Sequence, residues 1–117
     1  MVTKFGSCAY DHALTTSDLR ELRERYRYAG IAFPSSNPRM GVKREGAIAY
    51  VYSYGIPVLA VRMTMQPAYM RLWDGWSAST TNHIRKMADV SFRKAEWLSM
   101  PVGEWVESDK QATVWRP

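Results

Sequence analysis

The sequence predicts a small α+β domain in which an antiparallel sheet of about four to five strands packs against two helices. Apolar residues recur at helical spacing over residues 17–29 and again over residues 80–98. Between these segments, residues 47–65 alternate in side-chain character around a glycine, which is typical of a β-hairpin. The 117 residues, 46% of them hydrophobic and 23% charged, suffice for one core, so we expect a single domain over residues 1–117.

The first predicted helix, over residues 17–29, has Thr16 or Ser17 available as its cap and is followed by Gly30, a residue type that ends helices. Four residues form its predicted buried stripe: Leu19, Leu22, Tyr26 and Ala29. Three arginines fall together beside that stripe: Arg20, Arg23 and Arg27. Two interpretations of these arginines stay open, a solvated flank or a ridge that follows phosphates.

Residues 34–41 predict a loop, because they contain two prolines and a glycine, which disfavour regular structure. The loop continues into Lys43 and Arg44, so together with Arg39 it would carry three mobile cations. Such a loop suits anion contacts, and it equally suits an ordinary soluble connection.

Side chains in the first strand of the hairpin over residues 47–65 alternate between two faces, one with Tyr50, Tyr52 and Tyr54 and the other with Ala49, Val51 and Ser53. Gly55 is the predicted turn, and Pro57 is the first residue of the returning strand, a position at which proline is tolerated.

A second hairpin is predicted from residues 69–73, the turn dipeptide Asp74-Gly75 and residues 76–78, which would pair Trp73 with Trp76. After Pro101, residues 105–106 and 112–115 predict one or two short edge strands.

The second predicted helix, over residues 80–98, buries a face that comprises Ile84, Met87, Ala88, Phe92, Ala95 and Leu98. If this helix is continuous, the opposite face carries His83, Val90 and Trp97, flanked by Lys86 and Arg93. An exposed stripe of that composition would suit a protein partner. The alternative is a helix break near residues 89–91 that turns Trp97 inward.

The segment Ser77-Ala-Ser-Thr-Thr-Asn-His83 places several hydroxyls and an imidazole at the start of this helix. One interpretation is capping alone, with one threonine satisfying backbone amides and His83 bonded to a neighbouring strand. The other is a binding site for a phosphate or carboxylate, which the unpaired amides of a helix start favour.

Two short stretches carry a resemblance: Tyr52-Ser-Tyr-Gly-Ile-Pro-Val58 and Trp76-Ser-Ala-Ser-Thr-Thr-Asn-His83. Over about residues 47–98 the chain resembles a small domain of bacteriophage and mobile-element proteins, whose pattern is Ser-Tyr, an aliphatic pair, and then Ser/Thr-Thr-x-His. The matching positions are Ser53, Tyr54, Val58 and the serine, threonines and histidine of the second stretch. That domain has no established biochemical role, so the resemblance implies a phage setting and no particular reaction.

Motifs of catalysis are absent from the sequence, which has no glycine-rich phosphate loop, nucleophile elbow, paired-cysteine site or His-Glu-x-x-His helix. Cys8, Asp11, His12 and His83 do not have the spacing of a zinc site, so we expect no enzyme activity, metal or cofactor. A single cysteine excludes an intramolecular disulfide. With no signal peptide and no membrane-spanning segment either, we expect a cytoplasmic protein of a bacterial host cell without a membrane partner.

The charge is basic, with 16 Lys and Arg against 11 Asp and Glu and a formal net charge of +5, which favours nucleic acids or acidic protein surfaces as partners. Our leading hypothesis is a phage accessory protein that binds and obstructs a host protein or nucleoprotein complex, for instance as an anti-CRISPR inhibitor. Its predicted contact residues are Trp73, Trp76, His83, Lys86, Val90, Arg93 and Trp97.

The alternative hypothesis is a basic protein that binds DNA or RNA. Aromatic side chains would stack on unpaired bases, and the phosphate contacts would come from Arg20, Arg23, Arg27, Arg39, Lys43 and Arg44. A homodimer is compatible with either hypothesis.

Overall fold

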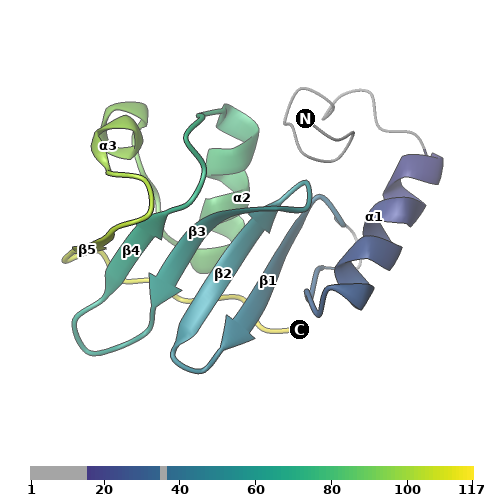
Figure 1. Cartoon of the computed structure of the whole chain (residues 1–117), viewed down its shortest axis with the longest axis horizontal. Helices are drawn as coiled ribbons and strands as arrows, with labels where there is room; N and C mark the ends of the chain where they lie inside the picture. The colour runs from purple at the N-terminus through teal and green to yellow at the C-terminus, as the bar shows by residue number, and fades with distance from the viewer. Residues whose placement is uncertain (1–15, 35–36) are drawn as a thin grey trace.

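A computed structural model describes residues 16–34 and 37–117 and contains a five-stranded antiparallel sheet whose strands follow chain order, β1-β2-β3-β4-β5 (Figure 1). The elements are α1 (Thr16–Tyr28), β1 (Met40–Glu45), β2 (Ile48–Ser53), β3 (Ile56–Arg62), β4 (Ala68–Arg71), α2 (Ala78–Ala88), α3 (Lys94–Ser99) and β5 (Trp105–Glu107). In Figure 1, α2 crosses behind the sheet, α3 lies near β4 and β5, and α1 lies beyond β1. The predicted α+β class is confirmed.

The predicted first hairpin is confirmed as β2 and β3, which pair in antiparallel register from Ile48 opposite Arg62 to Ser53 opposite Ile56. Tyr54 and Gly55 form its turn, with φ angles of 53° and 81°. This left-handed backbone suits Gly55 and is unusual for a tyrosine. It takes Tyr54 out of the strand alternation, and its side chain is buried instead of sharing a face with Tyr50 and Tyr52.

Strand β1 corrects the predicted loop, because Met40–Glu45 pairs with β2 along its whole length. Gly41 is necessary here: an added Cβ would lie 2.6 Å from Ile31 Cγ2 and 2.7 Å from the Ala32 carbonyl oxygen. The close approach lets Ala32 exchange two backbone hydrogen bonds with Val42, at 2.8 and 2.9 Å. Lys43 and Arg44 therefore occupy a strand and not a mobile loop.

The second predicted hairpin is wrong, because β4 pairs with β3 and β5 and residues 76–78 form no strand. The buried guanidinium of Arg71 holds the chain after β4 in a loop by donating to the carbonyl oxygens of Trp73 at 2.9 Å, Asp74 at 2.6 Å and Met100 at 3.1 Å. Trp73 folds back over Gly75, where an added Cβ would lie 2.5 Å from its ring. The expected pairing of Trp73 with Trp76 across a hairpin is therefore absent.

The helix predicted over residues 80–98 is two helices, α2 and α3. Asp89 ends α2 in a left-handed conformation, with φ 52°, and donates its N–H to the Arg85 carbonyl. The side chain of Glu96 then accepts the Arg93 N–H at 3.0 Å and fixes the start of α3. This break turns Trp97 inward, and its indole N–H donates to the Gly75 carbonyl at 2.7 Å. The predicted helix-break alternative is the one that the structure contains.

The main core lies between α2 and the inner face of the sheet, defined as the face that bears Val42, Val51, Leu59, Val61 and Tyr69. The predicted helix residues Ile84, Met87, Ala88 and Phe92 are buried in this core, but Ala95 and Leu98 are exposed because α3 has a different direction. The C-terminal segment runs along α2, where Thr113 and Trp115 donate N–H groups to the carbonyls of Ala88 and Met87. Of the two predicted terminal strands, β5 is confirmed and residues 112–115 form none.

A smaller core holds α1, with Leu22, Tyr26 and Ile31 buried against Phe33 and Tyr52. Leu22 and Tyr26 are buried as predicted, Ala29 is exposed, and the Leu19 side chain lies outside the described part of the structure. The Tyr26 hydroxyl accepts the Gly55 N–H at 3.0 Å, which ties α1 to the β2–β3 turn. Burial raises the pKa of Tyr26 far above its ordinary value, so the hydroxyl keeps its proton.

Candidate functional site

Four positions of the phage-domain pattern meet between the end of β2 and the first turns of α2. Ser53 Oγ lies 2.8 Å from His83 Nδ1 and 3.2 Å from Thr80 Oγ1. The Tyr54 and His83 rings are 5.3 Å apart. Ser53, Tyr54, Thr80 and His83 are each 5% exposed or less. We call these four residues the Ser53–His83 cluster.

The Ser53–His83 cluster joins the end of β2 to the start of α2. Ser77 caps α2 by accepting the Thr80 N–H at 3.0 Å, and Thr81 Oγ1 donates to the Ser77 carbonyl at 3.0 Å. Capping and the bond from His83 to a neighbouring strand are therefore both present, although the cap is Ser77 and not the predicted threonine. A hydroxyl beside an imidazole is also how nucleophilic enzymes activate serine, but these two side chains are buried away from any substrate in solvent. Cys8, Asp11 and His12 lie outside the described residues.

The predicted partner face on the second helix does not exist as one exposed stripe. His83, Val90 and Trp97 are buried, because the break between α2 and α3 gives Trp97 a new direction. Lys86 and Arg93 are exposed but lie on opposite sides of that break. Trp73 and Trp76 are partly buried against the core, and Lys94 Nζ lies 4.9 Å from the Trp76 ring centroid.

The predicted phosphate-binding residues do not form one surface either. Arg20, Arg23 and Arg27 are exposed on α1, where Arg27 pairs with Glu24. Arg44 points to the inner face and donates to the Val114 carbonyl at 3.1 Å. Arg39 is partly buried in the turn before β1, and Lys43 lies on the opposite, outer face of the sheet.

The outer face of the sheet presents a row of large side chains that the sequence did not single out as a site. Across the strands, Lys43 lies opposite Tyr50, Tyr50 opposite Ala60, Ala60 opposite Met70, and Met70 opposite Trp105. Because alternate residues of a strand point to opposite faces, these side chains share one side of the sheet. We call Tyr50, Tyr52, Met70 and Trp105 the outer-face cluster.

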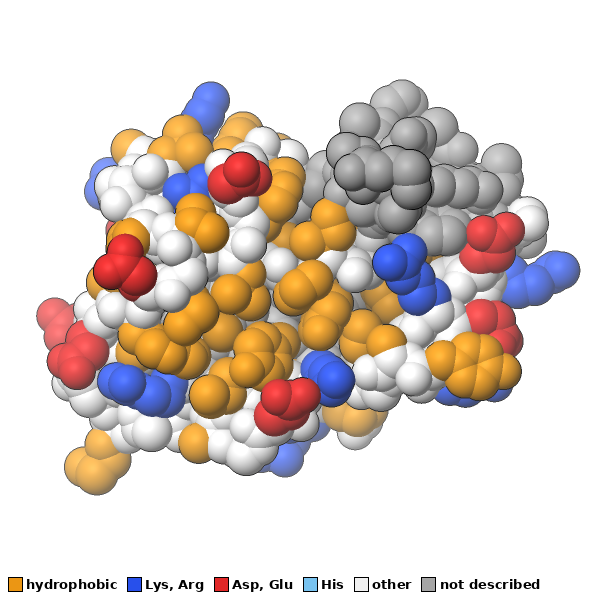
Figure 2. All heavy atoms as spheres, viewed as in Figure 1, with side chains coloured by type: hydrophobic (Ala, Val, Ile, Leu, Met, Phe, Trp, Pro, Cys, Tyr) orange, Lys and Arg blue, Asp and Glu red, His pale blue; other side chains and the backbone are white. Residues whose placement is uncertain are grey.

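The outer-face cluster is accessible in the described part of the structure. Figure 2 shows hydrophobic side chains gathered over the middle strands on this side. Tyr50, Tyr52 and Met70 are partly exposed, and Trp105 is 36% exposed. The α1 cluster packs on this side at Tyr52.

Two cations border this face. Lys43 Nζ lies 3.4 Å from Glu45, while Arg62 lies 3.7 Å from Glu107 and 5.7 Å from the Trp105 ring centroid. The alternation in the sequence predicts that Tyr50 and Tyr52 share one face of the hairpin. It does not show which face of the sheet the helices leave uncovered, since that depends on where α2 packs.

No known family matches this chain, and neither a curated protein nor a solved structure matches it. The phage-domain resemblance therefore stays a prediction. No group of three metal-binding side chains occurs among the described residues. Within the same part of the chain, none of the helices has the length and apolarity to cross a bilayer.

Proposed function

We propose that this protein is a non-enzymatic binding protein whose outer sheet face contacts single-stranded nucleic acid. The observation that carries the proposal is the outer-face cluster: accessible aromatic rings on an open sheet, bordered by Lys43 and Arg62. Unpaired bases stack on aromatic side chains, and four-stranded sheets with surface aromatics are used in this way in RNA recognition.

The spacing of the rings suits separate bases. Tyr50 and Tyr52 are two residues apart on β2, so their side chains emerge about 6.7 Å apart along the strand. Met70 and Trp105 extend the apolar surface across β4 and β5. A strand of nucleic acid lying over β2 to β5 would meet apolar surface along its whole path.

The charges around the face support the same partner. Exposed ion pairs such as Lys43–Glu45 and Arg62–Glu107 contribute about 0–1 kcal/mol, so a phosphate can replace the carboxylate at little cost. The net charge of +5 and the exposed arginines of α1 add long-range attraction for a polyanion.

The test is fluorescence anisotropy with labelled oligo(dT) and oligo(rU) of about 15 nucleotides, a length that spans the usual site sizes of such surfaces. Tyr50→Ala should weaken binding about 5-fold to 100-fold, because one stacking contact is lost. Tyr28→Ala is the matched control, since Tyr28 is 84% exposed on α1 and belongs to neither the sheet nor the outer-face cluster. The affinity should also fall with salt, with a logarithmic slope of about −0.7 for each phosphate contact.

Absence of binding at low salt, or equal binding by Tyr50→Ala and wild type, would contradict the proposal. The predicted obstruction of a host protein complex would then take precedence. Its contact surface would have to differ from the predicted stripe, because His83, Val90 and Trp97 are buried. The phage setting and the bacterial cytoplasm stay proposals that rest on the resemblance and on the single cysteine.

A further inference from the structure

Strand β5 leaves one edge of the sheet open in the described structure, because it pairs with β4 and is the last strand in the order. The register fixes which backbone groups face outward. Ser108 donates its N–H to the carbonyl of Pro67, the residue opposite it, at 3.1 Å. Hydrogen-bonded pairs alternate along an antiparallel ladder, so Val106 bonds to Tyr69, while the N–H and C=O groups of Trp105 and Glu107 point away from β4.

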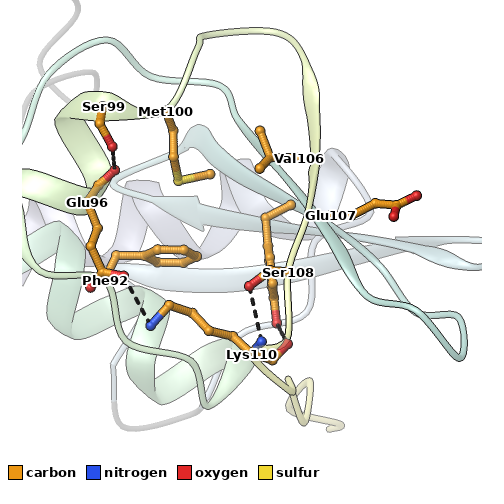
Figure 3. Close-up of a pocket in the computed structure, with 9 residues that line it drawn as sticks. Phe92, Glu96, Ser99, Met100, Val106, Glu107, Ser108 and Lys110 are labelled. Carbon is orange, nitrogen blue, oxygen red and sulfur yellow. Dashed lines mark hydrogen bonds and ion pairs between the residues drawn. The ribbon is translucent and has the colours of Figure 1, made fainter.

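A pocket of about 200 Å³ lies beside this edge, on the inner side of the sheet (Figure 3). Its apolar lining comes from Tyr69, Phe92, Met100 and Val106, and Glu96 and Lys110 lie at its polar side. Its volume is below the roughly 300–1,000 Å³ of sites for drug-sized ligands, so it suits a single apolar side chain. Val106 connects the two features, because it belongs to both the strand and the pocket.

The charged residues from position 104 to position 109, which cover β5 and its immediate flanks, are all acidic, although the chain as a whole is basic. Glu104, Glu107 and Asp109 are exposed along β5 and just beyond it. Arg62 partly offsets Glu107 at 3.7 Å, and Glu96 is engaged by Arg93 and Lys110. Among the described residues, neither Glu104 nor Asp109 forms an ion pair.

We propose that β5 accepts an extended peptide of a partner protein as an added strand, and that the peptide alternates apolar and basic residues. The residue opposite Val106 would point to the inner side and fill the pocket. Its neighbours would point to the outer side, where a Lys or Arg meets Glu107 and the Trp105 ring. Strand addition supplies backbone hydrogen bonds, the pocket selects an apolar side chain, and the acidic edge selects the charge.

A second copy of this chain fits the edge less well. Antiparallel pairing of two β5 strands would bring together two sets of Glu104, Glu107 and Asp109. Like charges on paired strands are destabilising. The charge therefore favours a basic partner segment.

The probe is the capped peptide Lys-Val-Lys-Leu-Lys-Val-Lys, titrated into isotope-labelled protein and followed through backbone amide shifts. The expected result is saturable shifts at Trp105, Glu107, Phe92 and Met100. Replacing the two lysines that flank the central leucine by proline should abolish them, because in antiparallel pairing these residues lie opposite Trp105 and Glu107 and their N–H groups bond to β5.

Glu107→Lys should weaken peptide binding at least 5-fold, and the matched control Glu45→Lys, an equal charge change at the far end of the outer face, should not. Equal binding by Glu107→Lys, equal binding of the proline peptide, or shifts confined to other strands would overturn the proposal. A dimer in sedimentation that Glu107→Lys disrupts would also overturn it, because the strand added to β5 would then belong to a second copy of the chain. Tyr50→Ala leaves this site unchanged, which separates the outcome from that of nucleic-acid binding.

Discussion

The two faces of one sheet differ in what covers them, and strand β2 shows this most clearly. It sends Ala49, Val51 and Ser53 to the inner face, beneath α2, and Tyr50 and Tyr52 to the outer face. The smaller residues are the buried ones, because α2 packs directly on that side. Side-chain size along a strand therefore does not show which face is the core. The inner face holds the fold together, and the outer face keeps Tyr50 and Tyr52 partly exposed.

The largest expected effect comes from truncating an aliphatic side chain on each face. Leu59→Ala on the inner face should lower the free energy of unfolding by about 2–5 kcal/mol, because Leu59 is fully buried and leaves a cavity. Ile48→Ala on the outer face should lower it by less than half as much, since Ile48 is partly exposed. Urea unfolding followed by circular dichroism measures both. Equal losses would show that something covers the outer face.

Two arginines on neighbouring strands sharpen the comparison. Arg71→Met should destabilise the protein by about 2–4 kcal/mol, because three carbonyl oxygens lose a buried charged donor. Arg62→Met should cost about 0–1 kcal/mol, since Arg62 forms an exposed ion pair on the outer face. The same unfolding experiment applies. If Arg71→Met left the free energy of unfolding unchanged, other contacts would hold the loop after β4.

The Ser53–His83 cluster should give an intermediate effect. Ser53→Ala should cost about 1–2 kcal/mol, because the buried Thr80 hydroxyl and His83 imidazole each lose a hydrogen bond. Ser91→Ala is the control, since Ser91 is exposed between α2 and α3. Thermal unfolding of the three proteins measures the difference. No change in Ser53→Ala would remove the structural role that we assign to the cluster.

The smallest expected effect is a pH dependence at α3. The Arg93 backbone N–H, then the Arg93 and Lys110 side chains, lower the pKa of Glu96 from 4.5 to about 2. A carboxyl whose pKa is lower in the folded state stabilises the fold above pH 4.5, and this contribution is lost as the pH falls toward 2. Glu96→Gln should therefore make stability fall less steeply between these values. If wild type and Glu96→Gln lost stability equally steeply in acid, the contacts of Glu96 with Arg93 and Lys110 would not stabilise the fold.

Local signals in the sequence predicted the elements that depend on neighbouring residues. The helix α1 with its buried Leu22 and Tyr26, the hairpin of β2 and β3, and β5 all follow from periodicity and turn residues. The bond from His83 to a neighbouring strand was also among the predictions, as was a hydroxyl cap at the start of the second helix, although the cap is Ser77 and not a threonine. These features are encoded within a few residues, so a single sequence is enough to find them.

Only the tertiary structure decided the remaining elements. The glycine and the charged residues of β1 gave no strand pattern in the sequence. This segment is a strand because it pairs with β2 and forms a bridge with Ala32. The break after α2 depends on Asp89 and on the distant Gly75 carbonyl that accepts the Trp97 indole N–H. A helical pattern continues across that break, which is why Trp97 was a candidate for exposure. The outer face was decided in the same way: the sequence determined that Tyr50 and Tyr52 lie together, and the packing of α2 on the other side left them accessible.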